Sequence, residues 1–355
     1  MTFTGKDRVL MAFNHQKGDR LPVFDVVNQP DIYVNHIGVD NYYPKGVPTV
    51  QLAKKIGMDA VMVHCTHYTC LIPPKDQWDG PDTFTDKFGI ASKVTPASWP
   101  LGMTYNSITA DENFLHLLQN TQVTDEDVAE VAAAVAEADD EIAVFGGVRS
   151  AFSFLFIALG IENLAMLMYD DPDLLVALIE AADDYWTKVG LKLLETGCTA
   201  LYVANDLGMN ERTLISPQQL REFFFPSMSK QIATWKEAGG KVIFHSCGNI
   251  DAVVDDIVAM GIDALNNLQE HAGMDIAKIK SLYQGKVTLI GNVDATNVLT
   301  SPDKTVIDGA LKKVIDIAGY DGGLIVATDH SFHKGIPEEN VLYFIDKAKE
   351  LGTFK

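Results

Sequence analysis

Short runs of hydrophobic and β-branched residues recur along this chain, and longer stretches with apolar residues at helical spacing separate them. Short apolar runs bounded by turn residues are typical of buried strands, and the longer stretches are typical of amphipathic helices. Eight runs fit the strand pattern: Val23–Val27, Ala60–Cys65, Ala143–Val148, Ala200–Ala204, Lys241–His245, Ala264–Leu268, Val287–Gly291 and Leu324–Thr328. The predicted helices are Thr4–Gln16, Pro48–Ile56, Asp125–Ala138, Ile161–Tyr169, Pro172–Thr196, Pro217–Ala238, Ile250–Met260, Asp275–Leu282 and Pro302–Ala318.

Eight strands that alternate with helices predict a parallel sheet, and eight is the number of strands that closes a barrel. We therefore predict a single α/β domain over residues 1–355, a (β/α)8 TIM barrel preceded by an N-terminal helix. A doubly wound open sheet is the alternative. The long interval between Ala60–Cys65 and Ala143–Val148 predicts an irregular or hairpin insertion, and such insertions on a barrel usually shape the substrate entrance.

Composition and charge narrow the possible functions. The chain has 355 residues, of which 47% are hydrophobic, so it can bury a large core. Acidic residues outnumber basic ones by 48 to 28, and nucleic-acid binding is disfavoured because it needs clustered Lys and Arg. The sequence shows neither a long apolar run nor a signal segment, so no membrane span is predicted. Four cysteines without disulfide-framework spacing predict reduced thiols and a cytoplasmic location.

Polar residues follow every predicted strand. Barrel enzymes carry their chemistry at the C-terminal ends of the strands, so these residues predict a polar catalytic mouth. A carboxylate at such a position can also cap the following helix, which is the simpler interpretation of Asp251. In strand order, the residues are Asn28 and Gln29, His64 and His67, Arg149 and Ser150, Asn205 and Asp206, His245 and Cys247, Asn267 and Gln269, Asn292 and Asp294, and Asp329 and His330.

The strongest chemical signal is the segment His245-Ser246-Cys247, which ends a predicted strand and is followed by Gly248. Side chains two residues apart on a strand point to the same face, so this imidazole and this thiol converge on a common point. Zinc favours nitrogen and sulfur ligands. The pair therefore predicts part of a zinc site, which needs at least one more ligand.

Three interpretations of that site stay open. In the first, His330 at the end of the last predicted strand is the third ligand, with His333 as a rival because the chain is leaving the strand there. In the second, the segment His64–Cys70 binds the metal, although its spacing matches no zinc module and its first Cys fits core packing. In the third, no metal binds, Cys247 is a buried thiol and His245 forms a hydrogen bond.

Segments spread over nearly the full length resemble the uroporphyrinogen decarboxylase superfamily, which folds as an (α/β)8 barrel. The matching segments are Asp7-Arg8-Val9-Leu10, Asp19-Arg20-Leu21-Pro22-Val23, Gly291-Asn292-Val293-Asp294 and Ile336-Pro337-Glu338-Glu339-Asn340-Val341. True decarboxylases have an arginine-rich signature after the first strand that holds the porphyrin carboxylates. This chain has Asn28-Gln29-Pro30-Asp31 there, so it departs from the decarboxylase arm.

The other arm contains the zinc methyltransferases of corrinoid-dependent methyl transfer, which the chain resembles at His245-Ser246-Cys247-Gly248-Asn249. These enzymes have a later Cys on the final strand, and the alignment places His330 at that position. A site of two His and one Cys is chemically sound for zinc. The resemblance therefore implies a zinc site formed by His245, Cys247 and His330.

The resemblance also implies a reaction and its partners. The chain is expected to move a methyl group from a small methylated donor, such as an aryl methyl ether, to the cobalamin of a corrinoid protein. That corrinoid protein is expected to be a separate partner, because the chain lacks a D-x-H-x-x-G corrinoid-binding motif. Asp206 and Asn292 are predicted to serve catalysis, and Asp206 can orient a ligand, join the metal or cap a helix. Asn28, Gln29 and Gln269 are predicted to contact the substrate.

Three other functions stay open at this point. One is methyl transfer from a methylated corrinoid to a thiol of the coenzyme M type, and another is uroporphyrinogen decarboxylation. The third is a non-catalytic barrel that binds the corrinoid protein. A decarboxylase of this superfamily needs no metal, so the metal content of the protein separates a methyltransferase from a decarboxylase.

Overall fold

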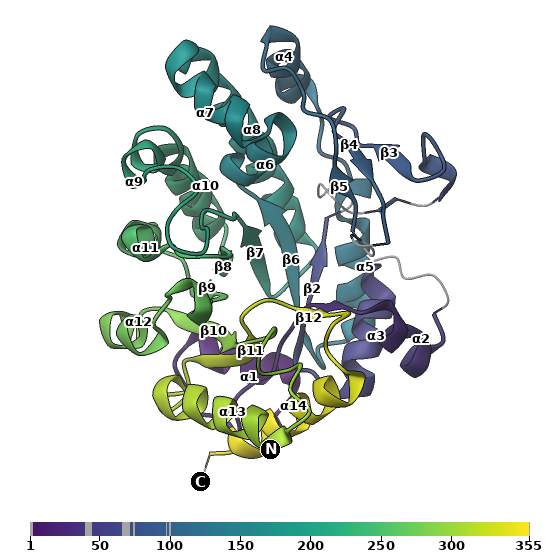
Figure 1. The fold of residues 1–355 in the computed structure, drawn as a ribbon, viewed down its shortest axis with the longest axis vertical. Coiled ribbons are helices and arrows are strands. Elements are labelled where there is room, and N and C mark those ends of the chain that lie inside the picture. Colours follow the sequence, from purple (N-terminus) through teal and green to yellow (C-terminus); the bar gives the residue numbers. More distant parts are fainter. Residues whose placement is uncertain are drawn as a thin grey trace.

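The computed structural model describes residues 3–39, 45–65, 72–73, 75–96, 98 and 101–354, and its centre is a parallel sheet surrounded by helices (Figure 1). Seven strands pair in the order β11-β10-β9-β8-β7-β6-β2, and each neighbouring pair is parallel. The strands are β2 (Ala60–His64), β6 (Ala143–Arg149), β7 (Ala200–Ala204), β8 (Val242–His245), β9 (Ala264–Asn266), β10 (Thr288–Val293) and β11 (Leu324–Thr328).

Two residues of the first predicted strand close this sheet into a barrel. Val23 forms a parallel bridge to Val326 of β11, and Phe24 forms one to Ala60 of β2. The amide of Phe24 donates to the carbonyl of Val326 at 3.0 Å, and the amide of Asp59 donates to the carbonyl of Val23 at 2.8 Å. The segment thus occupies the eighth strand position, and the predicted (β/α)8 barrel is confirmed.

The rest of the first predicted strand leaves the barrel. Its last residues form β1 (Val27–Asn28), which pairs in parallel with β12 (Phe332–His333). Asp25 lies at the point of departure, where its carboxylate accepts hydrogen bonds from the amides of Val26 and Thr328, both at 2.8 Å. Because β1 and β12 follow the C-terminal ends of neighbouring barrel strands, this small ladder forms part of the rim of the mouth.

Helices cover the outside of the barrel, and most of them match the predicted stretches (Figure 1). The unpredicted α6 is almost uniformly apolar and mostly buried, so it lacks the polar face that makes a helix recognisable in a sequence. The matching helices are α1 (Gly5–Phe13), α3 (Gly46–Ile56), α5 (Ala129–Ala138), α7 (Ile161–Asp170), α8 (Pro172–Glu195), α9 (Pro217–Gln219), α10 (Phe225–Glu237), α11 (Val254–Ala259), α12 (Ile276–Tyr283) and α13 (Lys304–Ala318). The others are α2 (Pro30–Ile37), α4 (Glu112–Asn120), α6 (Ala151–Leu159) and α14 (Glu338–Leu351).

The predicted insertion between β2 and β6 contains a three-stranded antiparallel sheet. Its strands are β3 (Thr83–Thr85), β4 (Ala91–Lys93) and β5 (Met103–Thr104), paired in that order. Asp86 stabilises the turn between β3 and β4, because one of its carboxylate oxygens accepts the amides of Phe88 and Ile90 at 2.9 Å. The expected hairpin is therefore present at the side of the barrel.

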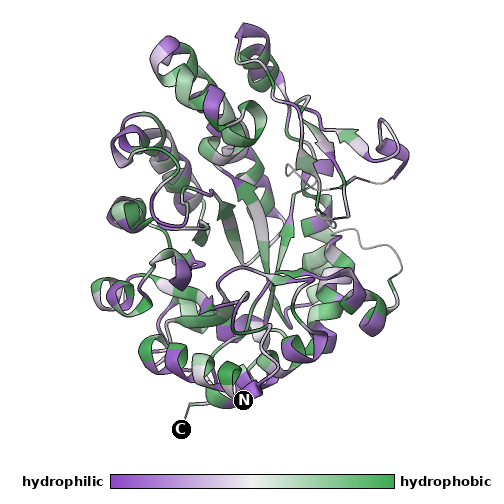
Figure 2. Ribbon diagram, viewed as in Figure 1, coloured by the Kyte–Doolittle hydropathy of each residue, from purple (hydrophilic) through white to green (hydrophobic). Residues whose placement is uncertain are grey.

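Aromatic side chains fill the barrel interior. The rings of Phe24 and Phe145 meet edge to face with centroids 5.0 Å apart, and Tyr202 lies 6.3 Å from Phe24. Hydrophobic residues concentrate on the strands and on the helix faces that meet them, whereas hydrophilic residues lie outside (Figure 2). Each fully buried Phe stabilises the fold by about 1.5–3 kcal/mol. Packed side chains thus fill the barrel interior beneath the mouth.

Candidate metal centre

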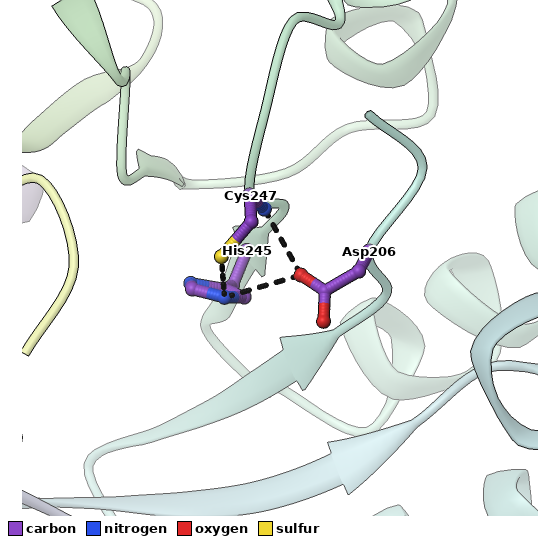
Figure 3. A group of neighbouring side chains, drawn as sticks. All are labelled: Asp206, His245 and Cys247. Carbon is purple, nitrogen blue, oxygen red and sulfur yellow. Dashed lines mark hydrogen bonds and ion pairs between the residues drawn. The ribbon is translucent and has the colours of Figure 1, made fainter. Parts of the chain in front are cut away.

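Three ligand-type side chains meet where β7 and β8 end (Figure 3). His245 is the last residue of β8, Cys247 follows two residues later, and Asp206 follows β7. The Nε2 atom of His245 lies 3.6 Å from Sγ of Cys247 and 3.4 Å from Oδ1 of Asp206. The ligand atoms of all three residues lie within 4.8 Å of one another, which is close enough for one cation to contact all of them.

Two glycines bring the loops after β7 and β8 into contact. Gly248 has φ +75, and a Cβ atom on it would lie 2.4 Å from the carbonyl carbon of Gly208. Only glycine tolerates both this conformation and this approach. The amide of Cys247 also donates to Oδ1 of Asp206 at 2.9 Å. Close packing of the backbones therefore holds the carboxylate beside the thiol.

A hydrogen-bond network sets the orientation of the His245 ring. The amide nitrogen of Asn266 donates to the carbonyl of Ile290 at 3.1 Å, which directs the Asn266 Oδ1 toward His245 Nδ1, 2.6 Å away. The hydroxyl of Tyr202 donates to the same oxygen at 2.5 Å. Asn266 Oδ1 can only accept a hydrogen bond, so Nδ1 of His245 carries a hydrogen. The Nε2 atom of the ring therefore faces Cys247 and Asp206. Metal-binding histidines are usually held in this way.

The charges in this cluster support one another. Burial disfavours the imidazolium form of His245, but its interactions with Cys247 and with the carboxylate of Asp206 outweigh burial and raise its pKa well above the usual range. Burial likewise disfavours the Asp206 carboxylate, but the bond from His245 and the Cys247 amide hold the pKa of Asp206 well below its usual range. A positive charge is thus stabilised at this point, and nitrogen, sulfur and oxygen donors together suit zinc.

His330 lies outside this group of close ligands among the described residues. Its Nδ1 lies 3.0 Å from the Ser331 hydroxyl, and burial together with the charge of His245 lowers its pKa. His333 is on β12, where its Nδ1 accepts the amide of Gly335 at 3.1 Å. The structure therefore brings Asp206 to the His-x-Cys pair, while the assignment of His330 or His333 as a ligand stays a prediction.

Two side chains that were predicted to contact the substrate form hydrogen bonds with the protein backbone instead. The amide nitrogen of Gln29 donates to the carbonyls of His333 and Ile336, the latter at 2.8 Å. The side-chain oxygen of Gln269 accepts the amide of Gly248 at 2.5 Å, so it supports the loop that carries Cys247. Both side chains thus build the rim of the mouth in this structure.

Asn28 and Asn292 have polar groups that a substrate could contact, unlike Gln29 and Gln269. Asn28 lines a cavity together with His64, and its amide nitrogen lies 3.3 Å from the Ser331 hydroxyl. Asn292 is buried, and its amide nitrogen donates to the carbonyl of Leu268 at 2.8 Å. Its carbonyl oxygen has no hydrogen-bond partner among the residues that the structure describes. Asn292 therefore presents a free acceptor at the end of β10.

The alternative metal segment has only its first residues in the described part of the chain. Residues 66–71 lie outside it, so the interpretation that includes His67 and Cys70 is not assessed by the structure. Cys65 is buried in the core, and burial raises the pKa of its thiol to about 12. Cys65 therefore has the properties of a packing residue, as its sequence context suggests.

A second cluster at the mouth was not assembled from the sequence. His271, Asp294 and Asp329 also place ligand atoms within 4.8 Å of one another. Both aspartates were recognised as strand-end residues, but His271 was missed because it lies in a short turn (Glu270–Ala272) beyond β9. The available signal was its position a few residues after a predicted strand.

The fold and this mouth define a (β/α)8 barrel with a candidate metal-binding centre at the strand ends. Residues 105–351 match the family model described as Uroporphyrinogen decarboxylase (URO-D), and the chain belongs to this family. The superfamily assignment made from the sequence is thereby confirmed.

Relatives from both arms of the superfamily match part of the chain. It is 27% identical over 194 residues to uroporphyrinogen decarboxylase of Aromatoleum aromaticum, covering 53% of this chain and 51% of that protein. It is 25% identical over 191 residues to methylated-thiol--coenzyme M methyltransferase of Methanosarcina mazei, covering 54% and 48%. The chain thus matches about half the length of these relatives. A methyltransferase structure from Methanosarcina mazei covers 98% of this chain and 99% of its own, with TM-score 0.72 and 16% identity, which shows a shared fold.

Among the described residues, no single helix is both long and apolar enough to cross a bilayer, although α6 and α7, bent by 106°, pass that test when taken together.

Proposed function

We propose that this protein is a zinc-dependent methyltransferase of a corrinoid methyl-transfer system. It moves a methyl group from a small methylated donor, such as an aryl methyl ether, to the cobalamin of a separate corrinoid protein. The observation that carries this proposal is the convergence of Asp206, His245 and Cys247 at the mouth of the barrel. The coenzyme M methyltransferase among the relatives supports the same reaction class.

The residues present fit a zinc ion. His245 and Cys247 supply the nitrogen and sulfur, and Asp206 or His330 completes a set of three ligands. Catalytic zinc sites keep one position open for a substrate. When bound there, zinc supplies a Lewis acid that polarises an ether oxygen or holds a thiol as its thiolate.

The remaining groups of the mouth prepare this chemistry. Asn266 and Tyr202 hold the His245 ring so that Nε2 faces the cluster. Asp206 stabilises positive charge beside that nitrogen, and it also fixes the Cys247 backbone. Asn292 offers a buried carbonyl oxygen to a donor group of the substrate. Asn28 is the other proposed substrate contact, while Gln29 and Gln269 keep the rim in shape.

Two related functions are the alternatives that the experiment below is designed to test. Transfer of methyl to a thiol of the coenzyme M type is favoured by the name of the Methanosarcina relative. This reaction would use the same proposed metal centre, with the methylated corrinoid as the methyl donor. Uroporphyrinogen decarboxylation requires positive side chains for the porphyrin carboxylates. The position of that signature carries Asn28-Gln29-Pro30-Asp31, and the mouth adds the carboxylates of Asp206, Asp294 and Asp329, which repel a polyanion.

The deciding experiment combines metal analysis with a methylation assay. The purified protein is expected to contain about one zinc per chain, as a three-ligand catalytic site does. With a reduced corrinoid protein and a panel of methylated substrates, the cobalamin spectrum is expected to change to that of methylcobalamin. A metal-free protein that decarboxylates uroporphyrinogen would overturn the proposal. Methylcobalamin consumed by an added thiol would select the coenzyme M direction.

The third ligand is tested by two substitutions. His330→Ala is predicted to lower the zinc content, as the resemblance implies, and Asp206→Ala is its counterpart. His116→Ala, which changes an exposed histidine on α4, is the matched control and retains zinc. Unchanged zinc in His330→Ala together with loss in Asp206→Ala would assign the carboxylate as the ligand. A thiolate site also needs a reducing compartment, so we propose a cytoplasmic location.

A further inference from the structure

The second cluster at the mouth is built from the three strand ends after β9, β10 and β11. Asp329 follows β11, and its side chain is only 1% exposed. Its Oδ1 accepts the amide of Ala295 at 2.9 Å. Its Oδ2 is buried and accepts no hydrogen bond from the described residues, although Nδ1 of His271 lies 3.3 Å away, within ion-pair range. This buried carboxylate oxygen thus faces the cluster with the His271 imidazole as its ion-pair partner.

The cluster has a surplus of negative charge. Asp294 contributes a second carboxylate, whose Oδ1 accepts the backbone amides of Thr296 and Asn297, both at 2.7 Å, and whose Oδ2 accepts the side-chain amide of Asn297 at 2.7 Å. Among the described residues, His271 is the only basic side chain that forms an ion pair with Asp329, and Asp294 forms none. A buried carboxylate is costly unless a cation or hydrogen bonds compensate it. One imidazole does not balance two carboxylates, so the cluster is suited to a further positive charge.

We propose that His271, Asp294 and Asp329 bind a second divalent cation, separate from the one at Asp206, His245 and Cys247. Two carboxylate oxygens and one imidazole nitrogen form a harder ligand set than the thiolate-containing cluster. The second site therefore prefers a cation such as Mn²⁺, while the thiolate site prefers zinc. This inference does not depend on methyl transfer, because it rests on the donor atoms alone.

Hydrogen bonds connect the two sites. The loop that carries Cys247 donates the amide of Gly248 to Gln269, and the side chain of Asn249 donates to the carbonyl of Ala272 at 2.8 Å. Gln269 and Ala272 flank His271 in sequence. A cation that holds His271 in place therefore also steadies the Cys247 loop, so occupancy of the second site is expected to tighten zinc binding at the first.

The test is a Mn²⁺ titration of the zinc-loaded protein, followed by electron paramagnetic resonance of the free ion. The wild type and Cys247→Ala are expected to bind about one Mn²⁺ per chain, because the second site has its own three ligands. His271→Ala and Asp329→Asn are expected to weaken that binding by at least about tenfold. His116→Ala is the matched control and binds Mn²⁺ like the wild type.

The outcomes distinguish the second site from non-specific binding and from binding of Mn²⁺ at the thiolate site. His271 is 41% exposed, so its substitution leaves the core intact, and a thermal unfolding scan of each variant verifies this. Failure of the wild type to bind Mn²⁺ overturns the proposal. Equal binding by the wild type and His271→Ala also overturns it, and so does binding that disappears in Cys247→Ala but persists in His271→Ala. Loss in both second-site variants with retention in Cys247→Ala establishes it.

Discussion

The two ends of the barrel pair their carboxylates with different kinds of side chain. At the N-terminal end of the strands, Asp59 has a side chain that is 3% exposed, and it binds Arg20 at 2.6 Å and Arg8 at 3.2 Å. It also accepts the amide of Val23 at 2.8 Å. Asp263 at the same end is paired with two lysines. Each of these carboxylates has strong positive partners, and the network ties the first residues of the barrel together.

At the C-terminal end, the carboxylates face histidine and cysteine instead. Asp206 lies 3.4 Å from His245, and Asp329 lies 3.3 Å from His271. Imidazole is a weaker and conditional source of charge, because its own pKa lies near neutral pH. The difference teaches that the N-terminal end is organised for stability, whereas the mouth keeps charges that a bound cation can compensate.

Removal of the thiolate ligand is expected to have the largest effect on function and little effect on stability. Cys247→Ala should lose zinc and abolish methyl transfer, because the site loses the sulfur that best binds zinc. Zinc analysis and the cobalamin assay measure both effects. Cys198→Ala, which changes a buried cysteine away from the mouth, is the control and should retain both. A Cys247→Ala protein with full zinc content would rule out this ligand.

At the N-terminal end of the barrel, a substitution is expected to reduce stability. Asp59→Asn should reduce the free energy of unfolding by about 3 kcal/mol, because it leaves the mostly buried guanidinium of Arg20 without its counter-charge and leaves Arg8 with Asp19 alone. Urea denaturation measures this change. Asp316→Asn breaks an exposed pair with Lys312 and should change the same quantity by less than about 0.5 kcal/mol. Equal effects of the two substitutions would contradict the proposed role of the Asp59 network.

The network behind His245 should have an intermediate effect. Asn266→Ala removes the acceptor of His245 Nδ1 and is expected to weaken zinc binding by about 10- to 100-fold. Competition with a chelator measures the affinity. Tyr202→Phe keeps the ring that packs on Phe24 but removes the hydroxyl, so it should produce a smaller loss. An unchanged affinity in Asn266→Ala would show that the ring needs no such support.

The last prediction concerns the pH dependence of stability, which a single buried carboxyl group controls. Burial raises the pKa of Asp25 from its usual value to about 7, and the bonds from Thr328 and Val26 oppose this only in part. The folded state therefore binds a proton that the unfolded state releases at a lower pH. The stability that this group contributes is fully present below pH 3.8 and is lost between pH 3.8 and about 7, by at most about 1.4 kcal/mol per pH unit. Asp25→Asn should flatten that decline in urea titrations, and an unchanged slope would contradict it.

Most of the barrel could be predicted because its strands are short apolar runs separated by amphipathic helices. The errors have local causes. The first strand was predicted as one run, yet only Val23 and Phe24 join the barrel, because the Asp25 carboxylate binds backbone amides where the chain departs. The helix α6 was missed because burial on several sides removed its polar face.

The sequence by itself indicated that His245 and Cys247 lie together, because they are only two residues apart, although β8 ends at His245. Only the tertiary structure decided that Asp206 joins them, because the register of β7 against β8 and the contact of Gly208 with Gly248 bring the two loops together. The same holds for His271, Asp294 and Asp329, which come from three separate strand ends. Local spacing is written in the chain, whereas proximity between loops depends on how the whole barrel closes.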